Sequence, residues 1–270
     1  MHHTHGFQRA FGTFPLKGDE LATALITALD VGYRAIDTAQ MYGNEKVIGT
    51  VLSASRIKRE DMLITSKVPV NQFDKANFIP SVKQSLDDLQ LEQLDVLLLH
   101  WPPGDGNIEP SVELLQEAKS QGLTQHIGVS NYTSKMLDQL VKFSDDTFVC
   151  NQIEFHPLLD QSIMLDASNR TGIPLSSYCS VARGKALQNP VIIEIAEQYA
   201  RTAGQVVLKW ILQQGVSVNA MSTNPENIRG NFNLLDFSLS NVDMARIDQL
   251  GQEQYRIVDK ALVPWAPEWD

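Results

Sequence analysis

The stretch RAIDTAQMYGNEKVIG, residues 34–49, joins a short apolar run to a helix-like segment. The run ends at Asp37, and Tyr42, Asn44 and Glu45 follow before the helical spacing begins. A strand followed by a helix is the repeating unit of parallel α/β folds. Side chains at the carboxyl end of such a strand stand where these folds place their functional groups. The stretch therefore predicts a βα unit with a site beside it.

The same alternation of short apolar runs and longer amphipathic segments continues along the chain. Helical spacing of apolar residues is clear at Leu21, Leu25 and Leu29, and again at Ile192 and Ile195. The strand candidates after RAID are MLITSKV at 62–68, DVLLLHW at 95–101, HIGVSN at 126–131, FVCNQIEF at 148–155, PLSSYCS at 174–180 and VSVNAM at 216–221. We expect an eighth strand near the start, around AFGTFPL.

This pattern predicts an α/β fold, a closed (β/α)8 TIM barrel that forms a single domain over residues 1–270. Barrels of this kind typically use about 250 residues, and the chain has 270 with no long Pro, Gly or Ser linker. A doubly wound sheet is the alternative, but it would usually show GxGxxG in its first βα turn, and that motif is absent. The glycines of GNEKVIG also have the wrong spacing for a phosphate-binding P-loop.

The composition of the chain indicates which classes of partner are disfavoured. Acidic residues outnumber basic ones by 32 to 22, which gives a formal charge of −10. Nucleic acid and anionic membrane surfaces are therefore disfavoured as partners. No apolar run reaches transmembrane length. Cys150 and Cys179 stand far apart without a CxxC pair, so we expect reduced thiols in a cytoplasmic protein. The opening MHHTH is expected to be a frayed terminus rather than a metal-binding tip.

Polar residues recur where the apolar runs stop. These residues are Asp37, Lys67, His100, Ser130, Asn131, Gln152 and Tyr178. Each has an ordinary structural explanation when it is taken alone, such as a helix cap or a surface charge. In a parallel barrel, however, all these strand ends open on one face, where barrel enzymes keep their chemistry. The pattern therefore predicts a site built from several strands.

Four of the ionisable residues suggest a proton donor. A phenol keeps its proton at neutral pH unless a neighbouring cation stabilises the phenolate, and Lys67 could act on Tyr42 in this way. Asp37 could pair with the lysine and offset the free-energy cost of burying its charge. We therefore expect a Tyr42 pKa close to neutral and a phenol that donates a proton, with His100 orienting a substrate oxygen.

Other chemistries fit these residues less well. His100, His126 and His156 come from different segments without a paired metal-ligand spacing, so no metal is expected, and His156 is interpreted as a buried structural residue. No GxSxG marks a serine nucleophile. A barrel isomerase or aldolase using Lys67 as a Schiff base is disfavoured, since a lysine paired with a carboxylate stays protonated.

Taken together, these residues resemble the aldo-keto reductases, NADP(H)-linked carbonyl reductases on a (β/α)8 barrel. The resemblance covers nearly the whole chain and is greatest for compact bacterial members similar to 2,5-diketo-gluconate reductases, since the segments after His100 and Tyr178 are short. The matching segments are GTF at 12–14, GYRAIDTAQMYGNE at 32–45, TSK at 65–67, LLLHWP at 97–102, IGVSN at 127–131, NQIEFHP at 151–157 and NPENIRGNF at 224–232.

The resemblance implies a role for each residue. Asp37, Tyr42, Lys67 and His100 would form a catalytic tetrad, and Trp101 would join Tyr42 and His100 at the substrate. Parts of the tail VPWAPEWD could line the pocket or serve only in packing. The implied cofactor-binding residues are Thr13, Asp37, Ser130, Asn131, Gln152, Tyr178, Ser180, Val181, Ser222, Thr223 and Asn231. Of these, Ser130, Asn131 and Gln152 would hold the nicotinamide carboxamide, and Tyr178 would stack on its ring.

Two departures from the family pattern concern the cofactor. Met221 stands where a lysine commonly meets the adenosine 2′-phosphate, and Asn227 replaces a family arginine. NADP(H) is favoured, with NAD(H) or dual use as the alternative, and Ser222, Thr223 and helix-start N–H groups, with Arg229, remain able to receive a phosphate. The loop YCSVARGK at 178–185 replaces a family Y-S-P-L, so its backbone is expected to follow a different path.

The sequence thus predicts a monomeric oxidoreductase that reduces small aldehydes or ketones, such as sugar-derived or dicarbonyl compounds. The alternative from another class is a catalytically retired barrel that binds the cofactor and acts as a regulatory or structural protein. An intact tetrad speaks against that alternative, because a retired site has no reason to hold a buried Lys–Asp pair.

Overall fold

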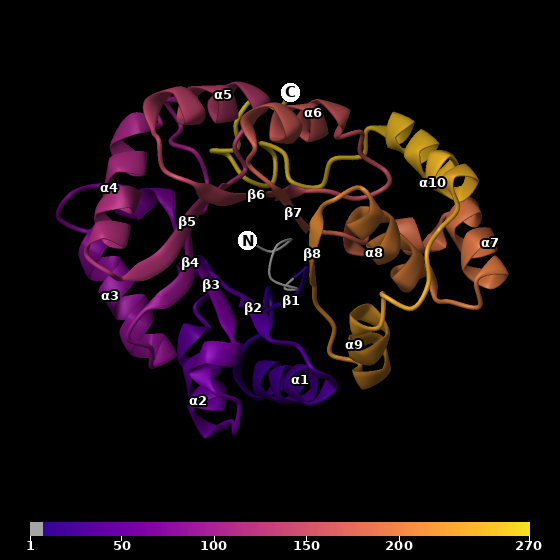
Figure 1. Ribbon diagram of the computed structural model, residues 1–270, viewed down its shortest axis with the longest axis horizontal. Helices are drawn as coiled ribbons and strands as arrows, with labels where there is room; N and C mark the ends of the chain where they lie inside the picture. The colour runs from indigo at the N-terminus through magenta and orange to yellow at the C-terminus, as the bar shows by residue number, and fades with distance from the viewer. Residues whose placement is uncertain (1–7) are drawn as a thin grey trace.

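The computed structural model describes residues 8–270, and the opening MHHTH lies outside the described residues. Within that range, eight parallel strands pair in chain order and close into a barrel (Figure 1). The strands are β1 (Arg9–Gly12), β2 (Ala35–Asp37), β3 (Leu63–Val68), β4 (Leu94–Leu99), β5 (Thr124–Ser130), β6 (Phe148–Glu154), β7 (Leu175–Tyr178) and β8 (Ser217–Ala220). The predicted (β/α)8 barrel is confirmed, including its eighth strand near the start of the chain.

The helices surround the barrel as an outer ring (Figure 1). They are α1 (Gly18–Val31), α2 (Glu45–Ala54), α3 (Phe78–Leu89), α4 (Glu109–Ser120), α5 (Ser134–Phe143), α6 (Ser162–Thr171), α7 (Pro190–Gln198), α8 (Ala203–Gln213), α9 (Pro225–Phe232) and α10 (Asn241–Asp248). The predicted helical spacing is confirmed, since Leu21, Leu25 and Leu29 form the buried face of α1. Helices on the outside and side chains on the inside bury both faces of the strands.

The strand register brings the polar residues to one end of the barrel. Gly12 of β1 pairs with Asp37 of β2, and Asp37 in turn pairs with Thr65 of β3. Because all strands run in the same direction, their carboxyl ends open on a single face. His100 follows directly after β4, and Tyr42 belongs to a short 3-10 helix (Gln40–Tyr42) between β2 and α2. Residues far apart in the sequence therefore meet at that face.

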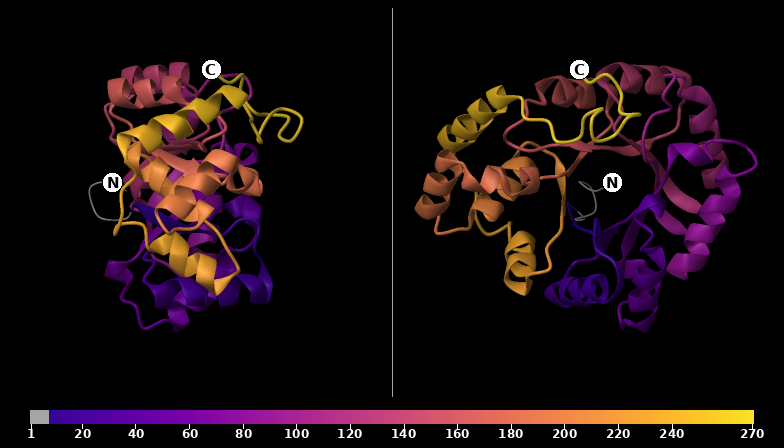
Figure 2. Two further views of the ribbon diagram at one scale, coloured as in Figure 1. Left: turned by 90° about the vertical axis from the view of Figure 1, so that its right-hand side faces the viewer. Right: turned by 180° about the vertical axis from the view of Figure 1, so that it is seen from behind.

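The C-terminal tail follows a 3-10 helix (Gln249–Glu253) and crosses the barrel beside β6 and β7 (Figure 1). It projects beyond one end of the barrel when the molecule is seen from the side (Figure 2). Its backbone is fixed to the barrel, since the Tyr255 N–H donates to the Leu158 carbonyl oxygen at 2.8 Å. At its end, the Asp270 carboxylate accepts two hydrogen bonds from Ser134 at 2.7 and 2.8 Å. Within residues 8–270, no helix combines the length and apolar character that a membrane crossing needs.

The packing of α2 on α3 generates a stability prediction at Gly49. A Cβ atom there would come within 2.3 Å of the Asp88 carbonyl oxygen and 2.7 Å of the Leu89 carbonyl carbon. We predict that Gly49→Ala lowers the free energy of unfolding by about 1–3 kcal/mol, because overpacking exceeds the gain of up to about 1 kcal/mol in helix propensity. Urea unfolding measures the difference.

Gly230 in α9 provides the matched control. A Cβ at this helical position would meet Gln205 only at 3.8 Å, which is ordinary contact. Gly230→Ala should therefore be neutral or stabilising. Equal stability of the two variants would contradict the proposed contact between α2 and α3.

Candidate active site

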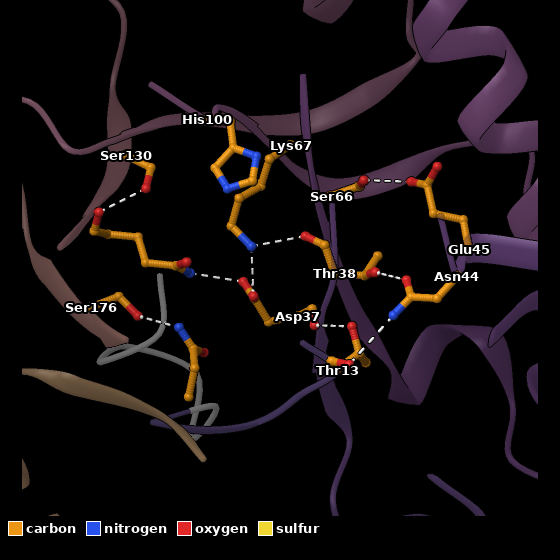
Figure 3. A network of polar contacts seen from close by, with 12 residues as sticks. Thr13, Asp37, Thr38, Asn44, Glu45, Ser66, Lys67, His100, Ser130 and Ser176 are labelled. Atoms are coloured by element: carbon orange, nitrogen blue, oxygen red, sulfur yellow. Dashed lines mark hydrogen bonds and ion pairs between the residues drawn. The ribbon is translucent and has the colours of Figure 1, made fainter. Parts of the chain in front are cut away.

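A buried ion pair lies at the centre of the site. The Lys67 Nζ atom is 2.6 Å from the Asp37 Oδ1 atom, and it also donates to the Thr38 carbonyl oxygen at 2.8 Å (Figure 3). Lys67 is 0% exposed and Asp37 is 6% exposed. The second carboxylate oxygen of Asp37 accepts from the Gln152 side chain at 2.7 Å. Burial alone would lower the lysine pKa, but Asp37 and Tyr42 outweigh it and hold the pKa above its usual value, so the ammonium stays charged.

Tyr42 lies against this ammonium. The Lys67 Nζ atom is 5.2 Å from the centre of the Tyr42 ring. The His100 ring meets the same tyrosine edge-on, with the ring centres 5.6 Å apart, and Phe14 packs on it from another side at 5.1 Å. The predicted association of Tyr42, Lys67, Asp37 and His100 is therefore present in the structure.

The expected acidity of Tyr42 needs correction. The sequence predicts a phenol with a pKa close to neutral, but burial raises the Tyr42 pKa above its ordinary value. The charge and hydrogen bonding of Lys67 lower it only in part, and the nearby Asp37 carboxylate raises it again. The ion pair presents little net charge to the phenol, so its effect is smaller than that of a free cation. The phenol therefore keeps its proton at neutral pH.

His100 is a neutral imidazole. Burial, together with the nearby charge of Lys67, holds the His100 pKa well below its ordinary value. Its Nδ1 atom is buried and has no hydrogen-bond partner among the described residues. A neutral imidazole carries one N–H donor and one acceptor nitrogen. His100 can therefore donate a hydrogen bond to a neutral oxygen without adding a second positive charge beside Lys67.

The ends of β5, β6 and β7 form a wall of uncharged polar groups. The Ser130 hydroxyl donates to the Gln152 carbonyl oxygen at 2.8 Å (Figure 3). The Asn131 side chain donates to the His100 carbonyl oxygen at 3.0 Å and accepts from the Tyr178 hydroxyl at 2.6 Å. Asn131 has a φ of 64°, a left-handed conformation that Asn tolerates better than most residues. This conformation turns its amide toward the other polar groups.

A second set of contacts fixes the loop that carries Tyr42. The Thr38 hydroxyl donates to the Asn44 side-chain oxygen at 2.7 Å, and the Asn44 amide donates to the Leu16 carbonyl oxygen at 3.0 Å. The Glu45 carboxylate is buried, accepts from the Ser66 hydroxyl at 2.5 Å, and has a pKa raised by burial. Figure 3 shows Thr38, Asn44, Glu45 and Ser66 of this set beside the ion pair. The sequence drew attention to Asn44 and Glu45 without predicting that they brace the loop.

The predicted residues after β7 lie in a strained loop. Cys179, Ala182 and Arg183 all have φ near +50°, a conformation that side chains rarely adopt. Ser180 is buried, and its hydroxyl shares a 2.7 Å hydrogen bond with that of Ser177. Val181 is partly buried. Strained backbone of this kind is typical of ligand-binding loops.

The predicted residues after β8 are more exposed. The Glu226 and Asn227 N–H groups at the start of α9 already donate to the Asn224 side chain at 2.8 and 3.2 Å. The Ser222 hydroxyl accepts from the Asn224 N–H at 3.1 Å. A side-chain cap thus occupies two of the helix-start N–H groups that the sequence analysis offered to a phosphate.

The remaining residues predicted for this region differ in exposure. Thr223 and Arg229 are exposed, Asn231 is half-buried, and Met221 is 40% exposed. Arg229 forms no ion pair with any described residue. Thr13 directly follows β1, the strand next to β8; it is buried and donates its hydroxyl to the Asp37 carbonyl oxygen at 3.0 Å.

The C-terminal tail covers the part of the site near Trp101. Trp101 is buried, packs with Val258 and Ala266, and meets the Trp269 ring at 6.3 Å. The anchor of this segment is Glu154, which the sequence analysis did not single out, although a charged residue inside an apolar strand was a signal.

Three hydrogen bonds satisfy the Glu154 carboxylate, which is 0% exposed. It accepts from the Ile257 and Val258 N–H groups at 2.7 and 2.9 Å, and one of its oxygens is 2.9 Å from the His156 Nε2 atom. The predicted structural character of His156 is thereby confirmed. No group of three or more His, Cys, Asp or Glu side chains suited to a metal ion occurs in the described part of the chain.

Comparison with known proteins agrees with this geometry. The sequence profile of the aldo/keto reductase family matches residues 9–252. Methylglyoxal reductase DkgB of Salmonella typhimurium is 38% identical over 262 residues, which cover 96% of this chain and 97% of the relative. A solved structure named as a candidate 2,5-diketo-D-gluconic acid reductase B has a TM-score of 0.93 at 38% identity, covering 97% of this chain and 93% of that one. For the aldose reductase of Schistosoma japonicum the TM-score is 0.87 at 26% identity, with 96% and 91% covered.

The depressed His100 pKa predicts a specific pH dependence of stability. Below the unfolded pKa near 6.5, the unfolded chain binds a proton at this histidine while the folded protein does not, so folding stability falls as pH falls. This residue alone should account for up to about 2 kcal/mol of lost stability at pH 5. Urea unfolding of the wild type and of His100→Gln, measured between pH 8 and pH 5, should show a shallower loss in the variant. Parallel curves would contradict the buried neutral imidazole.

Proposed function

Because the chain belongs to the aldo/keto reductase family, we propose that this oxidoreductase reduces the carbonyl group of small, polar aldehydes and ketones. The main support is the buried pair of Lys67 and Asp37 held against Tyr42. Such a pair is expensive to bury, and the phenol beside it lies where the barrel fold places reacting groups. Two of the relatives are named as a methylglyoxal reductase and as a candidate 2,5-diketo-D-gluconic acid reductase, and these names agree with small polycarbonyl substrates.

In this proposal Tyr42 is the proton donor. Reduction converts a carbonyl oxygen into an alkoxide, which is a far stronger base than a phenolate. A phenol that keeps its proton at neutral pH can therefore still deliver it when that negative charge develops. The Lys67 ammonium then stabilises the phenolate that remains, so its contribution is greatest after the proton has moved. The raised Tyr42 pKa is compatible with this role because the acid must stay protonated until then.

His100 is proposed to orient the substrate. Its neutral ring lies beside Tyr42, so its N–H can hydrogen-bond the same carbonyl oxygen from a second direction. Two donors on one oxygen fix the carbonyl plane and stabilise the negative charge that develops there. Trp101 lies next along the chain, with its buried side covered by the tail. These residues define where the carbonyl end of the substrate would sit.

A nicotinamide cofactor fits the donor set of the neighbouring wall. Ser130, Asn131 and Gln152 offer uncharged hydroxyl and amide groups, which suit a neutral carboxamide. Tyr178 could lie along the ring, and the strained loop at Ser180 could receive the pyrophosphate through its backbone. When bound, the reduced nicotinamide supplies the hydride. Thr13, directly after β1, would contribute through its contact with Asp37.

We place NADP(H) first as the cofactor, with NAD(H) or dual use as the alternative. Met221 and Asn227 provide no positive charge for a 2′-phosphate, and the cap by Asn224 occupies the first N–H groups of α9. Ser222 and Thr223, together with Arg229, which forms no ion pair with another residue of the range 8–270, are groups that could receive it. The protein therefore binds this phosphate with fewer charge-assisted contacts than a lysine and an arginine would give.

Two other functions are less well supported. A Schiff-base aldolase or isomerase would need a neutral lysine, but Asp37 keeps the pKa of Lys67 high. A retired barrel would have no use for the bracing of the Tyr42 loop by Asn44 and Glu45. The proposal is tested directly by measuring the oxidation of NADPH or NADH in the presence of methylglyoxal. The readout is the loss of absorbance of the reduced nicotinamide.

We predict that Tyr42→Phe lowers kcat by at least about 100-fold, because the variant has no proton donor at the carbonyl oxygen. Its affinity for NADPH, measured by calorimetry, should not change. Tyr255→Phe is the matched control. The Tyr255 ring belongs to the tail and packs against Lys185, so this variant should retain full turnover. Normal turnover by Tyr42→Phe would overturn the assignment of the proton donor.

Met221→Lys is predicted to improve NADPH binding by roughly 10- to 100-fold, because one charge-assisted hydrogen bond contributes about 1.5–3 kcal/mol. NADH lacks the 2′-phosphate, so its dissociation constant should stay the same. Met221→Gln has a similar length without the charge and serves as the control. Equal gains for NADPH and NADH would show that residue 221 does not face the phosphate.

A further inference from the structure

Asn219 is the last residue of β8 whose side chain points into the barrel. Its neighbours Val218 and Ala220 pack with the helices in the large hydrophobic core, so the alternation of a strand places Asn219 on the opposite, inner face. Beside it on β1 is Ala10, which belongs to the inner apolar cluster. β8 ends at Ala220, and the carboxyl ends of the strands open on the face that carries the site. A polar amide therefore lies at the mouth of the barrel.

The hydrogen-bonding capacity of this amide is only partly used. The Asn219 side-chain nitrogen donates to the Ser176 hydroxyl oxygen at 3.2 Å. The Asn219 Oδ1 atom is buried and has no hydrogen-bond partner within residues 8–270. Because buried polar atoms are normally hydrogen-bonded, this acceptor indicates a place for a donor that the described chain does not supply. The residue as a whole is only half-buried, so a molecule at the mouth of the barrel can meet the amide after a small rotation of the side chain.

A series of polar side chains connects Asn219 to the ion pair. Its partner Ser176 is buried and pairs in register with Gln152 of β6. Gln152 in turn donates to the second carboxylate oxygen of Asp37 at 2.7 Å. Tyr178, from the wall of uncharged polar groups, lies two residues after Ser176 and therefore faces the same side of β7. Asn219 extends that wall by one further strand.

The chemistry of the proposed cofactor limits what can donate to this oxygen. Its phosphate groups are ionised at neutral pH and only accept hydrogen bonds. Its carboxamide has N–H donors, but that group is proposed to lie against Ser130, Asn131 and Gln152. The adenosine phosphate is proposed to lie near Met221, beyond the end of β8, whereas Asn219 lies deeper in the barrel. The donors that remain for Asn219 are the hydroxyl groups of the ribose that carries the nicotinamide.

Resting on the proposed carbonyl reduction, we propose that the Asn219 side-chain oxygen accepts a hydrogen bond from a hydroxyl group of the nicotinamide ribose. Asn219 is then a further cofactor-binding residue, located on β8 between the proposed places of the nicotinamide ring and of the adenosine phosphate. An amide oxygen is neutral, so it recognises a hydroxyl group without adding a second carboxylate near Asp37. The contact serves NADPH and NADH equally, because the two cofactors share this ribose.

The test measures binding rather than turnover. Dissociation constants of NADPH, NADH, nicotinamide mononucleotide and adenosine 2′,5′-bisphosphate are determined by calorimetry for the wild type, Asn219→Leu and Ser217→Ala. Leucine is close to asparagine in size but has no acceptor. We expect Asn219→Leu to weaken the binding of both dinucleotides and of the mononucleotide by roughly 3- to 10-fold, the effect of one neutral hydrogen bond, and to leave the bisphosphate unchanged. Ser217, on the same face of β8, bonds the Leu175 carbonyl oxygen at 3.5 Å, and its variant is the matched control that should bind all four compounds normally.

Analogues of the mononucleotide test the proposal on the unaltered protein as well. Mononucleotides that lack the 2′- or the 3′-hydroxyl of the ribose are compared with the parent compound. Weaker binding of one analogue by the wild type, with no such difference in Asn219→Leu, supports the hydrogen bond.

Three results would overturn it. Equal binding of all three mononucleotides by the wild type would mean that a water molecule fills the acceptor. Equal losses for the mononucleotide and the bisphosphate in Asn219→Leu would mean that the residue only supports the barrel, and unchanged binding by this variant would mean that it does not meet the cofactor. If the wild type bound no nicotinamide nucleotide at all, the proposed function would be overturned together with this proposal.

Discussion

The ion pair between Lys67 and Asp37 is the interaction on which the rest of the site depends. Removing two charges from water costs several kcal/mol per ion, so the pair persists only with good geometry and with further hydrogen bonds to its free atoms. Thr38 and Gln152 provide these hydrogen bonds. The ammonium is thereby fixed beside Tyr42 and stays charged. The same pairing limits how far it can acidify the phenol, which therefore keeps its proton at neutral pH.

Strand β6 connects the two halves of the site. Gln152 hydrogen-bonds the Asp37 carboxylate, and Glu154, two residues later on the same strand, holds the backbone of the tail. Side chains two residues apart point to the same face of a strand, so one element positions both the ion pair beside Tyr42 and the cover over Trp101. The tail could not keep a fixed geometry by itself, because it lacks regular secondary structure after Glu253. A buried carboxylate with three hydrogen-bond partners gives it that geometry.

The proposed cofactor face and the proposed substrate face rely on different physical means. The cofactor face uses uncharged amides, hydroxyls and a strained loop around Cys179 and Ala182, and it lacks the cations expected near Met221. Its contribution to affinity would come from many directed hydrogen bonds. The proposed substrate face instead offers the Tyr42 phenol and the neutral His100 ring, which lie beside the ion pair of Lys67 and Asp37.

The sequence by itself determined the barrel, because the alternation of strands and helices indicates which segments are buried on both faces. It also located Asp37, Lys67 and His100, because polar residues interrupt the apolar runs at the ends of the strands. It also identified the family through segments spread along the chain. Only the tertiary structure decided the pKa of Tyr42. Burial raises this pKa, and the two charges of the neighbouring ion pair shift it in opposite directions. The tertiary structure also showed that Asn224 caps the first N–H groups of α9. It alone revealed the anchor at Glu154, because hydrogen-bond partners 104 residues apart leave no local pattern in the chain.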